Sequence, residues 1–279
     1  MKTNFEMPEE WANEFLELAQ KSKIESVYRP KRFIKKMKEN TGVVGKLSIW
    51  GTGSDGLERK NPLIVALGDS VTAGHFEWCM EEGKLELFLK GEWQPQAGEI
   101  IEITDAREVY HERFRRKLID LFEQTSVSVI NSGIAGDTII GMRNRLERDV
   151  IRYQPDLVLI NGAINWGGEG TTEEYKEILR EVVRKILKLT EADIILMTPN
   201  MVCSNPLSQG AVRLDERVEC IRELAKEEQV CLADAYIIWD TFVKQGHLLT
   251  KLLANGINHP SKTGHEVYVL VLMKLFESI

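Results

Sequence analysis

The stretch LIVALGDSVTAG, residues 63–74, decides the fold class. Its first five residues are apolar, which predicts a strand that is buried on both faces. The strand runs directly into Gly68, Asp69 and Ser70, and a second glycine follows at Gly74. Glycines on both sides permit a tight backbone turn that bulkier residues would resist. The stretch therefore predicts a buried strand that ends by presenting a serine on a turn.

Four further apolar runs repeat this pattern along the chain, and segments with helical periodicity separate them. Strands that alternate with helices predict an α/β fold with a parallel sheet of about five strands, covered by helices on both faces. One of the helices carries a start signal, Thr171 followed by Glu174, that is typical of a capping box. The apolar runs are 63–67, 127–130, 157–160, 194–197 and 230–232, and the helical stripes are Tyr110, Phe114, Leu118, Leu121 and Tyr175, Ile178, Leu179, Val182, Val183, Ile186.

Composition limits the class of protein. The 279 residues include 43% hydrophobic and 28% charged residues, and the formal net charge is −7. The acidic balance argues against nucleic acid as a partner, and we interpret the basic run RPKRFIKKMK (29–38) as a solvated helix face and not as an anion-binding patch. No secretory signal or membrane-spanning stretch is visible, and the four cysteines contain no C-x-x-C pair. We therefore expect a cytoplasmic protein with reduced thiols, no membrane contact, no metal and no organic cofactor; its oligomeric state is left open.

Two segments interrupt the alternation of strands and helices. Residues 1–60 predict two helices and a glycine-rich tract, which we interpret as an N-terminal helical extension to a domain over 61–279. Residues 75–105 are an insertion that directly follows the serine turn. Insertions at the ends of strands often shape the entrance to a substrate site. Phe76, Trp78 and Trp93 are the candidate substrate contacts in this insertion, with ordinary packing as the favoured alternative.

Three later segments place polar residues directly after predicted strands. VINSGIAGDT (129–138) contains Gly136, QPDLVLINGAINWGG (154–168) contains Asn165, and ANGINHPSKTGH (254–265) contains His259. Ligands of parallel α/β sheets bind beyond the carboxyl ends of the strands. A backbone N–H at Gly136 and the amide of Asn165 are donors suited to an oxyanion, and an imidazole beside a serine is a general base.

In order and spacing these four blocks resemble those of the SGNH hydrolases, the GDSL-type lipases and esterases. The resemblance covers about residues 62–279 and implies a flavodoxin-like α/β/α sandwich. It implies Ser70 as the nucleophile, Gly136 and Asn165 as oxyanion donors and His259 as the base. The implied activity is a serine esterase that cleaves small acyl esters, with acetyl esters of carbohydrates as the leading case. The alternatives are a lipid or thioester acylhydrolase, or a binding protein with a weakened hydrolase site.

The third block departs from the usual Gly-x-Asn-Asp, because here it reads Ala163-Ile164-Asn165-Trp166. Trp166 is expected to face either the substrate or the core. Asp69, Trp166 and Trp78 are the candidate substrate contacts.

The last block lacks the aspartate that usually precedes the histidine by three residues. Asn255 and Gly256 stand just before His259 instead. The sequence therefore does not identify the group that orients the imidazole of His259. Asn255 or a neighbouring backbone carbonyl is favoured over Asp234 or Asp240, because Asn255 and its neighbours lie close to His259 in the chain. We interpret His75 and His265 as supporting or surface residues near the site.

Overall fold

The computed structural model describes residues 7–23, 26–40, 61–123, 126–166, 170–203 and 209–277. A five-stranded parallel sheet forms its centre, with the strand order β4-β1-β5-β6-β7. Taken in chain order, this is the 2-1-3-4-5 order of flavodoxin-like folds. Each predicted apolar run forms one of these strands, so the predicted fold class is confirmed. The strands are β1 (Leu63–Gly68), β4 (Ser128–Gly133), β5 (Leu157–Asn161), β6 (Asp193–Met197) and β7 (Cys231–Ala233).

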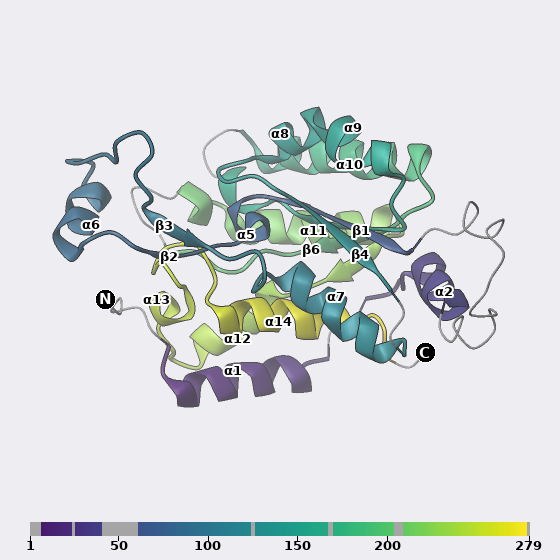
Figure 1. Ribbon diagram of the computed structural model, residues 1–279, viewed down its shortest axis with the longest axis horizontal. Coiled ribbons are helices and arrows are strands. Elements are labelled where there is room, and N and C mark those ends of the chain that lie inside the picture. The colour runs from purple at the N-terminus through teal and green to yellow at the C-terminus, as the bar shows by residue number, and fades with distance from the viewer. Residues whose placement is uncertain are drawn as a thin grey trace, which may run out of the picture.

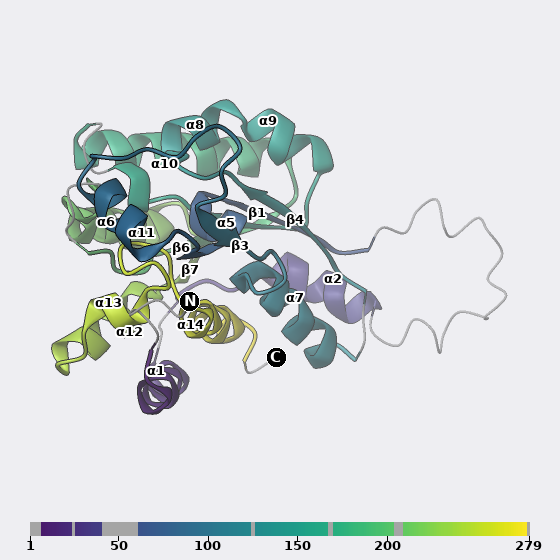
Figure 2. The same cartoon turned by 60° about the vertical axis from the view of Figure 1, so that its left-hand side comes forward.

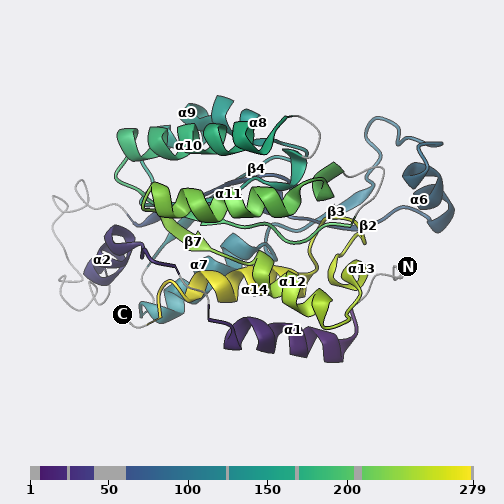
Figure 3. The ribbon, with the colours of Figure 1, turned by 180° about the vertical axis from the view of Figure 1, so that it is seen from behind.

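Helices cover both faces of the sheet and make a three-layer sandwich (Figures 1 and 3). Successive strand residues point to opposite faces, so Ile64 enters one hydrophobic core and Val65 the other. One layer contains α8 (Ile139–Asn144), α9 (Leu146–Asp149), α10 (Thr172–Leu189) and α11 (Leu214–Glu227). The other contains α7 (Tyr110–Leu121), α12 (Tyr236–Lys244) and α14 (Lys262–Met273). The predicted capping box of Thr171 and Glu174 begins α10.

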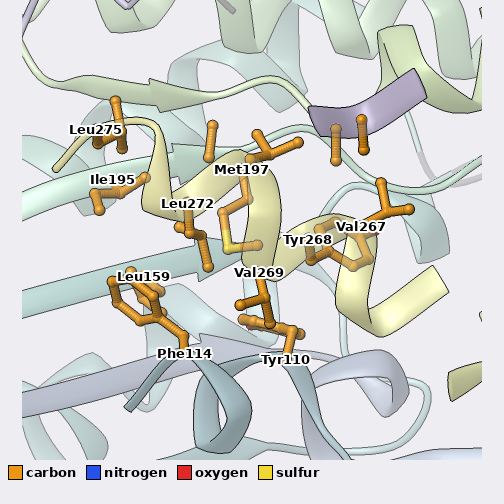
Figure 4. Packing of buried hydrophobic residues seen from close by; sticks show 14 of the residues in the cluster. Tyr110, Phe114, Leu159, Ile195, Met197, Val267, Tyr268, Val269, Leu272 and Leu275 are labelled. Atoms are coloured by element: carbon orange, nitrogen blue, oxygen red, sulfur yellow. The ribbon is translucent and has the colours of Figure 1, made fainter. Parts of the chain in front are cut away.

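Helix α14 packs at the centre of the larger core. Figure 4 shows its Val269 near Tyr110 of α7, and its Leu272 between the sheet and Phe114. All four side chains are fully buried. Burying large apolar side chains of this kind stabilises the fold by roughly 1.5–3 kcal/mol each. This packing holds the start of α14 in place, and the segment just before that helix carries His259.

The first two helices share this core. Helix α1 (Glu9–Lys21) buries Phe15 against two aromatic rings of α12, at centroid distances of 4.8 and 5.0 Å. Helix α2 (Lys31–Asn40) buries Phe33, and the Phe33 backbone N–H donates to the Asp193 carboxylate at 2.9 Å. Helix α1 thus packs on the outer side of α12 and α14, whereas α2 packs against β6 (Figure 1). The glycine-rich tract after α2 lies outside the described residues.

The insertion after β1 folds as a small unit of its own. Strands β2 (His75–Trp78) and β3 (Glu102–Thr104) pair antiparallel, and α6 (Glu82–Leu89) between them extends away from the sandwich (Figures 1 and 2). The hairpin lies at the same end of the sheet as α5 (Ser70–Ala73) and α13 (Leu249–Leu252). Short 3₁₀ helices span Ile151–Tyr153, Ile164–Trp166 and Gln209–Ala211. Among the described helices, none combines the length and apolar character needed to cross a bilayer.

Candidate active site

Ser70 is the first residue of α5, directly beyond the carboxyl end of β1. The turn requires a glycine at 68, because a Cβ there would lie 2.0 Å from Oγ1 of Thr72 and 2.7 Å from the carbonyl oxygen of Asn161. β1 lies between β4 and β5, where the direction of winding of the sheet reverses. This is the position at which α/β sheets of this order bind ligands. The structure thus places Ser70 where the sequence predicted it.

His259 meets Ser70 as predicted. Its Nε2 lies 3.0 Å from Oγ of Ser70, and both residues are buried. The loop that carries the histidine is held at both ends. The Ala254 N–H donates to the carbonyl of His259 at 2.8 Å, and Leu253 forms a β-bridge with Pro260. An imidazole held at hydrogen-bond distance from a hydroxyl has the geometry of a general base.

The carboxylate beside His259 comes from the insertion. Oε1 of Glu102 lies 2.7 Å from Nδ1 of His259. This nitrogen makes no well-aligned hydrogen bond, so the contact is close but bent. Catalytic contacts of this kind often become aligned only when substrate binds. The other oxygen of Glu102, Oε2, lies 2.8 Å from Nδ1 of His75.

Glu102 is ionised in this setting. Burial alone would raise the pKa of its carboxyl, but the contacts with His259 and His75 outweigh burial and lower the pKa to about 2. An ionised carboxylate only accepts hydrogen bonds. The proton of neutral His259 therefore belongs on Nδ1, which leaves the Nε2 lone pair facing the hydroxyl of Ser70.

Asn255 does not contact the ring of His259, which was the role expected of it. Its Oδ1 accepts the backbone N–H groups of Ile257, Asn258 and His259, each at 3.0 Å. The side chain thus shapes the histidine loop, and Glu102, rather than Asn255 or a backbone carbonyl, lies beside Nδ1 of the ring. An amide oxygen that already accepts three amides is directed away from the imidazole, which is the physical reason for the correction.

The two other carboxylates that had been considered are engaged elsewhere. Asp234 binds the Arg222 guanidinium, with contacts of 2.7 and 3.1 Å, and accepts the hydroxyl of Thr198. Asp240 pairs with Lys244 on α12 at 2.6 Å. Neither is the partner of His259.

The two oxyanion candidates lie on adjoining segments. Gly136 has φ of +74°, in a turn closed by the Asp137 N–H donating to the Ile134 carbonyl at 3.1 Å. A positive φ favours glycine at this position. Nδ2 of Asn165 donates to the carbonyl of Asp137 at 3.0 Å. An amide nitrogen carries two hydrogens, so one remains for another acceptor.

Two of the candidate substrate contacts have structural roles instead. Asp69 is 1% exposed and caps α5, its Oδ1 accepting the Val71 N–H at 3.0 Å. Trp166 is 3% exposed and donates from Nε1 to the carbonyl of Thr171 at 3.1 Å. Trp166 thus faces the core, one of the two environments expected of it, and Asp69 caps a helix instead of contacting substrate, which corrects the expectation for Asp69.

The aromatic residues of the insertion differ in environment. Phe76 is 1% exposed and packs against the ring of His265, so it belongs to the core. Trp78 is half-buried, and its Nε1 donates to the carbonyl of Asn255 at 2.9 Å. Trp93 is half-buried beneath Lys84. Trp78 therefore holds the loop before His259 through this hydrogen bond. Its role as a substrate contact stays a prediction.

Sequence reasoning missed Glu102. The insertion contains many acidic residues, and nothing in their spacing distinguishes this one. Glu102 lies between Ile101 and Ile103, which indicates a strand. This pattern does not show which side chain the carboxylate of Glu102 contacts. Across the described ranges no group of three or more His, Cys, Asp or Glu side chains is arranged to hold a metal ion.

A serine at the switch point of a parallel sheet, beside an imidazole whose other nitrogen faces a carboxylate, is the arrangement that serine hydrolases use. The chain belongs to the GDSL-like lipase/acylhydrolase family, which it matches over residues 66–267, and it is a carboxylic ester hydrolase.

Similar proteins agree with this assignment. An acetylxylan esterase from Geobacillus stearothermophilus is 27% identical over 165 residues, covering 55% of this chain and 74% of that protein. The crystal structure of Axe2, an acetylxylan esterase from the same organism, superposes with a TM-score of 0.57 at 22% identity, covering 78% of this chain and 95% of that one. LAE5, an α/β hydrolase from the metagenome of Lake Arreo in Spain, gives a TM-score of 0.58 at 21% identity, covering 77% and 94%. The two structures share the fold of this chain.

Proposed function

We propose that this esterase removes small acyl groups, acetyl first among them, from hydroxyls of carbohydrates, through a covalent intermediate on Ser70. The observation that carries the proposal is the 3.0 Å contact between Oγ of Ser70 and Nε2 of His259, with Glu102 behind the ring. The acetyl and carbohydrate parts rest on the acetylxylan esterase similarity.

These contacts support the following reaction. Oγ of Ser70 attacks the ester carbonyl while Nε2 of His259 takes its proton, and Glu102 stabilises the imidazolium that forms. The tetrahedral oxyanion is held by the backbone N–H groups of Ser70 and Gly136 and by Nδ2 of Asn165. His259 then protonates the leaving alkoxide, which departs as the sugar alcohol. Water, deprotonated by His259, attacks the acyl-enzyme and releases the carboxylic acid.

Glu102 also bears on the alternative of a weakened, binding-only site. The reason for that alternative was the missing aspartate of the last block. A buried carboxylate beside His259 supplies the charge that the block lacks, so a hydrolase is the better supported function.

The test uses turnover and covalent labelling together. We expect hydrolysis of p-nitrophenyl acetate and of acetylated xylo-oligosaccharides, with p-nitrophenyl octanoate and acetyl thioesters cleaved more slowly. A fluorophosphonate should form one adduct, on Ser70, and Ser70→Ala should lose both activity and labelling. Faster cleavage of octanoate than acetate would favour a lipid acylhydrolase, and labelling that survives in Ser70→Ala would overturn the assignment of the nucleophile.

A further inference from the structure

The carboxylate of Glu102 is shared between two histidines, of which the proposed mechanism uses one. Oε1 lies 2.7 Å from Nδ1 of His259, and Oε2 lies 2.8 Å from Nδ1 of His75. His75 begins β2, directly after the glycine that ends α5. We propose that His75 is a positioning residue, which holds the carboxylate of Glu102 against His259 and makes the base strength of His259 depend on the charge of His75. This inference rests on the proposed function.

The geometry makes His75 the principal anchor of Oε2. Because Glu102 can only accept, His75 donates from Nδ1. The side chain of Glu102 is 12% exposed, so little water is available to replace this donor. Asn255 offers Nδ2 to Oε1, but at 3.4 Å the contact is long. Without His75 the carboxylate is free to rotate away from the bent contact with His259, which needs a fixed acceptor.

The charge of His75 acts through the same carboxylate. When His75 is neutral, the full negative charge of Glu102 is available to stabilise the imidazolium of His259. When His75 is protonated, it neutralises part of that charge, and the ring centroids of the two histidines lie only 5.7 Å apart. A protonated His75 therefore weakens the support that Glu102 gives to the imidazolium of His259.

Other titratable groups surround the pair. Asp105, which follows β3, is paired with Arg107. Helix α14 contributes His265, and the turn at the end of β1 contributes Asp69; both act electrostatically on His259. Helix α5, which packs against β2, contributes the hydroxyl of Ser70, which contacts Nε2 of His259. Glu102 is thus the carboxylate in direct contact with His75.

Two substitutions separate positioning from packing. His75→Asn keeps an N–H donor near the position of Nδ1 and cannot be protonated, whereas His75→Phe keeps a ring and removes the donor. We expect His75→Phe to lower kcat by roughly tenfold with KM nearly unchanged, and His75→Asn to recover most of that loss. The matched control is His247→Phe, which removes another histidine in contact with a glutamate, Glu14 at 3.3 Å, beside α1 and α12. It should leave kcat unchanged.

The pH dependence of kcat/KM provides a measurement that a purely packing role of His75 would not change. The acid limb of log kcat/KM should be steeper in the wild type than in His75→Asn, because the substitution removes one of the two protonations that lower the rate. Equal kcat in His75→Phe and wild type, or identical acid slopes in wild type and His75→Asn, would overturn the proposal.

If the wild type is active and labelled on Ser70, such a result refutes the role of His75 alone. If the wild type is neither active nor labelled, the proposed function fails first. Should His75→Phe not fold, the slope in His75→Asn still decides.

Discussion

Oε1 of Glu102 lies 2.7 Å from Nδ1 of His259, although the first residue belongs to an insertion after the first strand and the second to the loop before the last helix. The usual aspartate of this family is a near neighbour of the histidine in sequence. Here an antiparallel hairpin supplies the carboxylate instead. The insertion therefore contributes a charged side chain to the candidate site.

Glu102→Gln should lower kcat by roughly 10²–10⁴, with a smaller change in KM, because a neutral amide neither fixes the imidazole tautomer nor stabilises the imidazolium. Steady-state kinetics on p-nitrophenyl acetate measure the effect. Glu99→Gln is the matched control, since Glu99 lies in the same insertion but is exposed and pairs with Lys84 at 3.3 Å. A variant at 102 that is as active as this control would remove Glu102 from the mechanism.

Asn255→Asp should reduce kcat/KM by roughly tenfold. The substitution replaces an N–H donor 3.4 Å from Oε1 of Glu102 by a second carboxylate, and like charges at this distance oppose each other. Asn258→Asp, which puts a charge in the same loop at a residue that accepts from Nδ2 of Asn255, should have a smaller effect. A rise in activity of Asn255→Asp would instead return the orienting role to position 255.

Asn165→Ala should lower kcat by roughly 10²–10³ and leave KM comparatively unchanged, which is the usual effect of removing one oxyanion donor. Asn131→Ala is a suitable comparison, because Asn131 also donates to a backbone carbonyl, that of Ala73 at 3.3 Å. If both variants lose only thermal stability and keep their kcat, Asn165 is structural.

Asp69→Asn should change the pH dependence of stability. Burial, the largest effect, raises the pKa of Asp69 from 3.8 to about 6. A carboxyl with a raised pKa holds its proton more tightly in the folded state, so its stabilising contribution is present below pH 3.8 and is lost as the pH rises through about 6. An asparagine keeps the acceptor for the Val71 N–H and does not ionise.

Relative to the wild type, Asp69→Asn should therefore gain on the order of 3 kcal/mol between about pH 4 and about pH 8, following 1.4 kcal/mol per pKa unit. Urea unfolding at the two pH values measures this. Asp120→Asn, on the exposed face of α7, should show no such trend. A gain at low pH that disappears at high pH would contradict the sign.

The sequence by itself determined the elements and the chemistry that depends on neighbouring residues. Apolar runs form the strands, the capping box begins α10, and the blocks around Ser70 and His259 carry the two residues that meet at 3.0 Å. These features follow from local periodicity, from turn chemistry and from the rule that parallel strands end at one edge.

Only the tertiary structure decided which carboxylate serves the histidine and which side chains face the site. Glu102 is one of many acidic residues in its insertion, and the pairing of β2 with β3 selects it. Trp166 and Asp69 occupy positions next to catalytic blocks, yet they are buried, because the directions of their side chains depend on helices α10 and α5 that pack around them. Contacts between distant segments are set by packing and hairpin register, and these have no local signature in the sequence.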